Sequence, residues 1–205
     1  MAELFRRFGR DLRGMKHYVI ASALVFLAGC ALGATDRNLE EFVRANLEAL
    51  GAFVDELGKS ENPKLYMFFF IFFNNAIKSI FFVFFGAVFA LFPLFVLVVN
   101  GLVLGYLLMH PSQPIPFWEL LIKGILPHGI IELPAVILAC AYGIRFGGLT
   151  LRGLAALFSE ERRAVWLRDI MHFLQMTVPL VIVLAVSLFV AAVIESTVTF
   201  YLMTN

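Results

Sequence analysis

Apolar runs about as long as a lipid bilayer is thick recur along this chain of 205 residues. They cover residues 18–34, 65–85, 94–109, 127–147 and 170–201. A membrane-spanning helix needs about 20 mostly apolar residues. Hydrophobic residues make up 61% of the chain, against roughly half in a soluble domain. The sequence therefore predicts an all-α polytopic membrane helix bundle, a single integral membrane domain over 1–205 with about five transmembrane helices.

A shorter apolar stretch lies ahead of the fourth run, after a proline-rich loop at 110–116. Residues 117–126 are too few to cross a bilayer. One straight helix over 117–147 would be about 46 Å long, more than the roughly 30 Å of a hydrocarbon core. We therefore expect a break at Gly124 or Pro127 and a re-entrant or interfacial half-helix before the fourth span.

The distribution of charge predicts which segments lie on each side of the cell membrane. Residues 1–17 and 149–169 are rich in arginine, and the positive-inside rule places both in the cytoplasm. The acidic segment 35–64, whose apolar residues have helical spacing, is then an amphipathic extracytoplasmic helix. Residues 65–148 form the core and 170–205 the last span, which puts the C-terminus outside the cell.

The first apolar run has a second interpretation. A basic segment followed by an apolar run is also typical of a signal peptide, and Leu27-Ala28-Gly29-Cys30 resembles a bacterial lipoprotein cleavage box. Cleavage there would leave four spans and make Cys30 the new N-terminus. We interpret the run as a retained helix, because Gly29 and Gly33 form a G-x-x-x-G face suited to helix packing.

Polar residues interrupt the apolar runs. They are Asn74, Asn75 and Lys78 in the second run, Asn100 in the third, and His128 and Glu132 in the fourth. Helix residues four apart share a face, and a charge inside the membrane needs a partner. The simplest interpretation is a structural polar cluster in which Glu132 pairs with Lys78. The amides and His128 would satisfy the remaining hydrogen-bonding groups.

His128 and Glu132 also fit two ligands of a divalent metal such as zinc, because imidazole and carboxylate both bind this ion. The second histidine of a His-Glu-x-x-His motif is missing, so His110, Asn100 or Glu195 would have to supply a third ligand. No other cofactor is implied. A further interpretation is a proton or ion path, since ionisable residues in broken membrane helices mark transport sites.

The order of these motifs resembles the stage II sporulation protein M family of bacteria and archaea. The resemblance covers about residues 65–150 and rests on four elements: Phe72-Phe73-Asn74-Asn75, Asn100-Gly101-x-x-x-Gly105, Leu126-Pro127-His128-Gly129-x-x-Glu132 and Ala139-x-x-x-Gly143. It implies a polytopic membrane protein that works with cell-envelope remodelling partners. It brings no catalytic residue set to carry over.

Three functions follow from these observations: a non-enzymatic membrane organiser or complex component, an ion or small-solute transporter or channel, and a metal-dependent intramembrane enzyme. The net charge of only +1 gives no basis for binding nucleic acid. We expect membrane lipid, envelope-remodelling proteins and a second copy of this chain as partners. The homo-oligomer is expected from the small-residue faces and the abundant aromatic surface.

Overall fold

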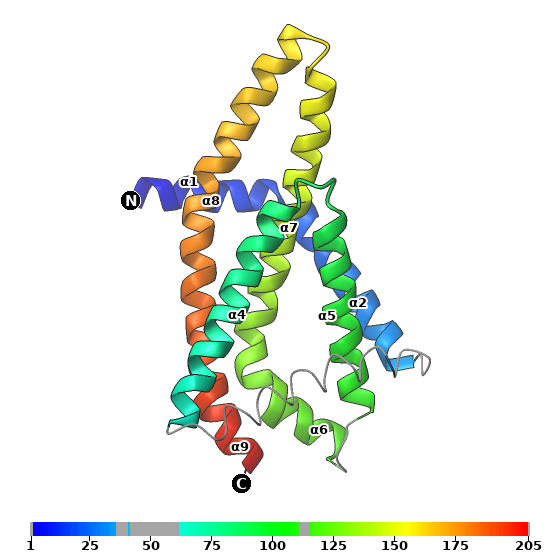
Figure 1. Ribbon diagram of the computed structural model, residues 1–205, viewed down its shortest axis with the longest axis vertical. Coiled ribbons are helices and arrows are strands. Elements are labelled where there is room, and N and C mark those ends of the chain that lie inside the picture. The colour runs from blue at the N-terminus through cyan, green and yellow to red at the C-terminus, as the bar shows by residue number, and fades with distance from the viewer. Residues whose placement is uncertain (1, 36–40, 42–61, 111–114, 205) are drawn as a thin grey trace.

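Helices account for nearly all of the residues that the computed structural model describes, and no strand occurs among them. The described residues are 2–35, 41, 62–110 and 115–204. The predicted amphipathic helix at 35–64 therefore lies almost entirely outside the described part of the chain. The chain ends of the described part lie far apart, with α1 near mid-height and α9 at the bottom of the molecule (Figure 1).

Five helices in the described residues are long and apolar enough to cross a membrane, which confirms the predicted fold class. They are α2 (Lys16–Thr35), α4 (Pro63–Phe85), α5 (Leu91–Met109), the helix through α7 (Leu126–Ala156) and the helix through α8 (Glu160–Ile194). The short α1 (Ala2–Gly14) lies across the bundle, nearly at right angles to its long axis (Figure 1). α7 is central, because it contacts α2, α4, α5 and α8.

The expected break before the fourth span takes the form of a π-helical segment. α6 (Phe117–Glu119) passes into η2 (Leu120–Ile125), and α7 follows directly. A π-helical turn holds one extra residue, which changes the direction of the side chains that follow. The arm formed by α6 and η2 turns away from the axis of α7 at the lower end of the bundle (Figure 1).

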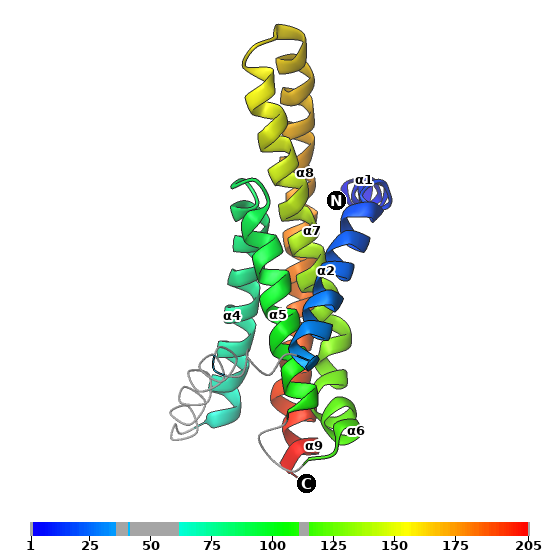
Figure 2. The same ribbon diagram turned by 90° about the vertical axis from the view of Figure 1, so that its right-hand side faces the viewer.

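α7 and α8 extend past the other spans as a two-helix hairpin, most clearly seen in Figure 2. α8 contains 35 residues, or about 52 Å at 1.5 Å per residue, well beyond a hydrocarbon core of about 30 Å. The Trp166 indole NH donates to the Leu149 carbonyl at 2.9 Å and ties the two arms together. We call residues 145–169, which include the predicted basic segment, the hairpin. This segment is largely helical.

The small-residue faces predicted from the sequence pack against each other inside one chain. A Cβ atom added to Gly29 of α2 would lie only 2.7 Å from the Val98 carbonyl oxygen of α5. Gly101 and Gly105 of α5 meet the backbone of α2 in the same way. These faces are therefore covered by helices of the same chain and do not support the predicted homo-oligomer. That prediction now rests on the exposed aromatic surface alone.

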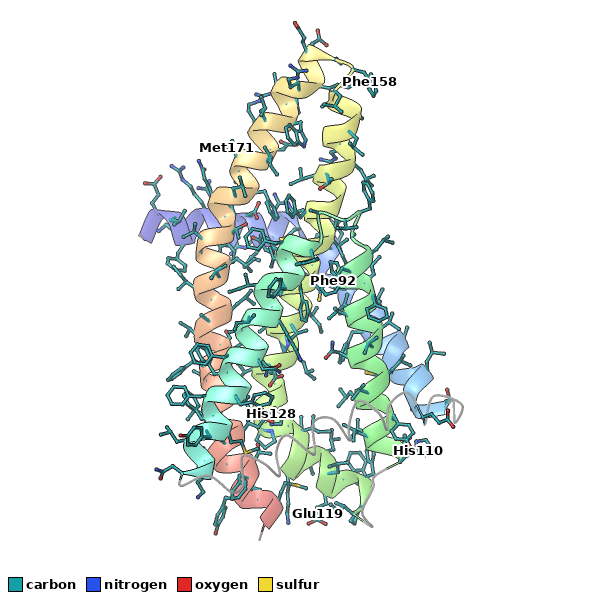
Figure 3. The ribbon with its side chains drawn as sticks, viewed as in Figure 1. Phe92, His110, Glu119, His128, Phe158 and Met171 are labelled. Carbon is teal, nitrogen blue, oxygen red and sulfur yellow. The ribbon has the colours of Figure 1, made fainter. Side chains whose placement is uncertain are left out.

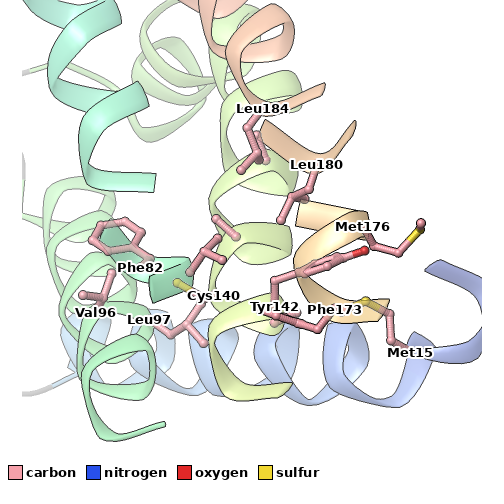
Figure 4. Close-up of a cluster of buried hydrophobic side chains, with 14 of the residues drawn as sticks. Met15, Phe82, Val96, Leu97, Cys140, Tyr142, Phe173, Met176, Leu180 and Leu184 are labelled. Atoms are coloured by element: carbon pink, nitrogen blue, oxygen red, sulfur yellow. The ribbon is translucent and has the colours of Figure 1, made fainter. Parts of the chain in front are cut away.

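The apolar core is formed where α7 meets its neighbours (Figure 4). Its members are almost free of solvent contact and include Val83, Leu97, Cys140, Tyr142, Phe173, Met176, Leu180 and Leu184. Both cysteines are free thiols. This core fixes the relative rotation of α4, α7 and α8, and so decides which polar residues meet.

Candidate functional site

Three ionisable side chains meet where the start of α7 faces the end of α8. His128, Glu132 and Glu195 each offer one ligand atom, and these atoms all lie within 4.8 Å of one another. All three residues are half-buried. We call them the acid–histidine cluster. Figure 3 shows His128 in the lower half of the bundle.

Hydrogen bonds connect this cluster to α4 and to the C-terminal segment. The Asn75 side-chain amide donates to Glu132 Oε1 at 2.9 Å, and Asn74 donates to Asn75 Oδ1 at 3.2 Å. His128 Nδ1 lies 3.2 Å from Thr199 Oγ1. Glu132 Oε2 is buried and has no hydrogen-bond partner among the described residues. One of the two Glu132 oxygens is therefore bound, and the other is available.

Irregular helix geometry flanks the cluster on both sides. η2 ends at Ile125, immediately before α7 and three residues before His128. The second π-helical segment, η3 (Glu195–Thr199), begins at Glu195 and also contains Thr199. Such segments inside α-helices frequently occur at functional sites, because they redirect side chains. Here η3 contains both Glu195 and Thr199, whose side chains lie near His128 of α7.

The cluster contains two carboxylates that no described lysine or arginine neutralises. Within residues 2–35, 41, 62–110 and 115–204, no lysine or arginine forms an ion pair with Glu132 or Glu195. Two ionised carboxylates this close repel each other strongly in a low-dielectric helix bundle. The arrangement therefore needs a proton or a bound cation to be stable.

Lys78 lies away from the cluster, contrary to the expected pairing with Glu132. Because helix residues four apart share a face, α4 has two neighbouring faces here, one with Asn74 and Lys78 and one with Asn75 and Ser79. Ser79 is fully buried and Asn75 reaches Glu132, so the second face points into the bundle. Lys78 is exposed, and no ion pair joins it to another described residue.

Two of the suggested third ligands lie elsewhere. The Asn100 side chain donates to the Val96 carbonyl of its own helix at 2.8 Å. The His110 ring stacks on Tyr106 with 4.9 Å between ring centres, at the end of α5 and away from His128 (Figure 3). Glu195 is the suggested ligand that the fold brings to the site. Thr199 was missed, although its i,i+4 spacing from Glu195 is a signal that could have identified it.

A second polar site, which the sequence analysis also missed, lies at the base of the hairpin. Asp11 of α1 has a side chain only 7% exposed, and its Oδ2 accepts hydrogen bonds from Arg145 at 2.5 Å and from Tyr142 at 2.9 Å. Asp11 Oδ1 lies 2.9 Å from His172 Nε2 of α8. This Asp11 site joins α1 to both arms of the hairpin.

The surroundings of Asp11 favour its charged form. Burial alone raises the pKa of this carboxyl group. The hydrogen bonds from Arg145 and His172, the positive charge of Arg145 and the hydrogen bond from Tyr142 together outweigh that effect. The pKa of Asp11 therefore lies below its ordinary value, and Asp11 is ionised at neutral pH.

Comparison with known proteins gives a family and a distant relative. The sequence model described as Stage II sporulation protein M matches residues 22–200, a range that contains the whole acid–histidine cluster. An uncharacterized protein of Methanocaldococcus jannaschii is 32% identical over 111 residues, which make up 54% of this chain and 47% of that protein. The match thus spans about half of that curated relative's length. No solved structure matches the chain.

Proposed function

The chain belongs to the Stage II sporulation protein M family, and we propose that it is a non-enzymatic membrane organiser that holds partner proteins at the cell membrane. It is an integral membrane protein by family and by its five apolar helices. The proposed partners are cell-envelope remodelling factors or other members of the same complex. The proposed orientation has the N-terminus and the hairpin in the cytoplasm and the C-terminus outside.

The observation that carries this proposal is the hairpin surface. Phe158 at the hairpin tip is 91% exposed, and Leu151, Leu154 and Leu157 on the α7 side are 53%, 47% and 63% exposed. Large apolar side chains gathered on a part of the molecule that projects from the spans are typical of protein interaction sites. The same hairpin carries exposed arginines, which add a basic rim.

An apolar groove runs along this surface. Its volume is about 540 Å³, and it is lined mainly by apolar side chains from both arms, including Leu154, Leu157, Trp166 and Leu167. Arg163 also lines this groove. A groove of this kind fits the apolar face of a partner helix whose flanking residues are acidic. The surface therefore supports recruitment of a protein rather than chemistry on a small substrate.

The proposal is tested by site-specific photocrosslinking in cells. A photoreactive phenylalanine analogue replaces Phe158 at the hairpin tip or, as a matched control, Phe81, which is 50% exposed on α4. We expect discrete protein adducts at position 158 and none at position 81. Leu154→Asp should remove the adducts, because it places a charge in the groove. Identical background labelling at both positions would count against an organiser.

An ion or proton transporter is the second candidate function, favoured by the acid–histidine cluster between two π-helical segments. Ionisable residues beside irregular membrane helices are a common feature of transport sites. Proteoliposomes containing the wild-type chain should then show cation or proton flux that Glu132→Gln abolishes and Lys78→Met retains. An organiser shows no flux and keeps its crosslinked partners when Glu132 is changed to glutamine.

A further inference from the structure

We infer that His128, Glu132 and Glu195 form a binding site for one divalent cation of the zinc class, held between the fourth and fifth spans. This site goes beyond the organiser role and does not depend on it. The inference rests on three observations: the donor set, the unbalanced charge of the cluster, and the orientation of its side chains by neighbouring residues.

The donor atoms fit a transition-metal ion. One imidazole and two carboxylates are ligands that zinc accepts, whereas Mg²⁺ and Ca²⁺ prefer oxygen ligands alone. In a tetrahedral zinc site with bonds of about 2.1 Å, ligand atoms lie about 3.4 Å apart. The three ligand atoms here lie within 4.8 Å of one another, so small side-chain rotations bring them to bonding distance.

The negative charge of the cluster would be neutralised by a bound cation. No basic side chain in the described part of the chain forms an ion pair with Glu132 or Glu195. A divalent ion neutralises both carboxylates at once and removes the cost of placing two negative charges in an apolar bundle. The Glu132 oxygen that lacks a hydrogen-bond partner is the atom left free to bind it.

Neighbouring residues orient the ligands as they do in metal sites. Metal-binding histidines usually form a hydrogen bond through the ring nitrogen that does not touch the metal. Thr199 Oγ1 takes this position at His128 Nδ1, which leaves Nε2 for the cation. Asn75 holds the other oxygen of Glu132 in place at 2.9 Å. Three helical elements, α4, α7 and η3, thus supply ligands and supporting residues to one point.

The binding experiment uses the full chain in lipid nanodiscs, with any affinity tag removed and endogenous metal stripped by a chelator. Zn²⁺ is added, unbound ion is removed by gel filtration, and zinc per chain is measured by elemental analysis. We expect one zinc per chain and a thermal midpoint several degrees above that of the stripped protein, because a ligand bound only to the folded state stabilises it.

Glu195→Gln and His128→Gln should lose the retained zinc and the thermal shift. The matched control is Glu119→Gln, whose side chain forms a partly exposed pair with Lys123 outside the cluster and should change neither result. Wild-type protein that retains no zinc overturns the inference. Retention by Glu195→Gln equal to that of wild type also overturns it, because the zinc then lies elsewhere.

Milder variants keep the test informative if the ligand variants fail to fold. Asn75→Ala and Thr199→Val leave all three ligands in place and remove only their supporting hydrogen bonds. Each should weaken zinc affinity by about 10- to 100-fold. Unchanged affinity in both variants contradicts the proposed geometry. A thermal midpoint that responds to pH and not to Zn²⁺ means that a shared proton holds the carboxylates together, which rejects the cation site.

Discussion

Asp11 joins three helices through a single carboxylate. Its partners Tyr142 and Arg145 come from α7 and its third partner, His172, from α8. The guanidinium of Arg145 also lies 5.9 Å from the centre of the Tyr142 ring and 6.0 Å from that of Phe173. The arginine is therefore held by an ion pair and by aromatic faces together. This makes the Asp11 site a structural connection between α1 and the hairpin.

We predict that Asp11→Asn destabilises the protein by about 3–5 kcal/mol, because it leaves the charge of Arg145 without a partner in a mostly buried site. A thermal melt in detergent measures the loss. Glu3→Gln is the matched control. It breaks the exposed Glu3–Arg7 pair on the same helix, which should be worth about 0–1 kcal/mol. Equal losses for the two variants would show that Asp11 is not a structural anchor.

The low pKa of Asp11 predicts how this stabilisation depends on pH. A group whose pKa is lower in the folded state stabilises the fold above its unfolded-state pKa, here 3.8. The stabilisation is lost as pH falls through the folded-state value. The stability difference between wild type and Asp11→Asn should therefore not decrease from about pH 7 to pH 5 and should shrink below about pH 4. A difference that shrinks between pH 7 and pH 5 would contradict this assignment.

At the scale of single residues, the sequence predicted the candidate site only in part. It identified His128, Glu132 and Asn75 as polar residues that must face protein, because a polar group facing lipid is costly. It paired Glu132 with Lys78, which the structure places on an exposed face. Asn75 and Glu132 are 57 positions apart, and the rotation of α4 that brings them together depends on packing against α7 and α8.

Close packing of α2 on α5 is the feature that connects the first span to the rest of the bundle. Without a hydrophobic driving force between helices in lipid, association depends on van der Waals contact and close backbone approach. Gly29 and Gly33 provide this approach on α2, and Gly101 and Gly105 provide it on α5. The pattern of small residues was sufficient to predict both faces, though not that they pair with each other.

We predict that Gly101→Ala destabilises the bundle by roughly 1–3 kcal/mol, because its added methyl group would overlap the backbone of α2. Gly9→Ala on α1 is the matched control, since a Cβ atom there meets nothing within 4 Å and alanine favours helix formation. Thermal melts of both variants in the same detergent provide the measurement. A Gly101→Ala variant as stable as Gly9→Ala would mean that α2 and α5 pack less closely than described.

For the whole molecule, the described residues contain five candidate spans, and this odd number predicts that the two chain ends lie on opposite sides of the membrane. The arginines of α1 and of the hairpin lie toward the same end of the bundle, as Figure 1 shows from the positions of these elements. The positive-inside rule predicts that basic segments lie on the cytoplasmic side, so the end of the bundle that holds both segments is the predicted cytoplasmic end. The orientation itself is a prediction.

Cysteine labelling tests this orientation after Cys30 and Cys140 are replaced by alanine. We expect a membrane-impermeant maleimide to label Asn62→Cys in intact cells and to label Phe158→Cys only after permeabilisation. Both positions are exposed, so accessibility within the protein does not limit the reaction. The reverse pattern would show that the hairpin faces outward, and the search for partners would then move to the extracytoplasmic side.

Run length, composition and small-residue spacing were enough to establish a membrane protein with five spans, because bilayer thickness and helix rise set those features along the chain itself. The contacts of Glu195 with His128 and of Asp11 with Arg145 could not be predicted from these sequence features. Arg145 lies 134 positions from Asp11. Such contacts depend on the rotation and offset of every packed helix, which are settled only when the complete bundle forms.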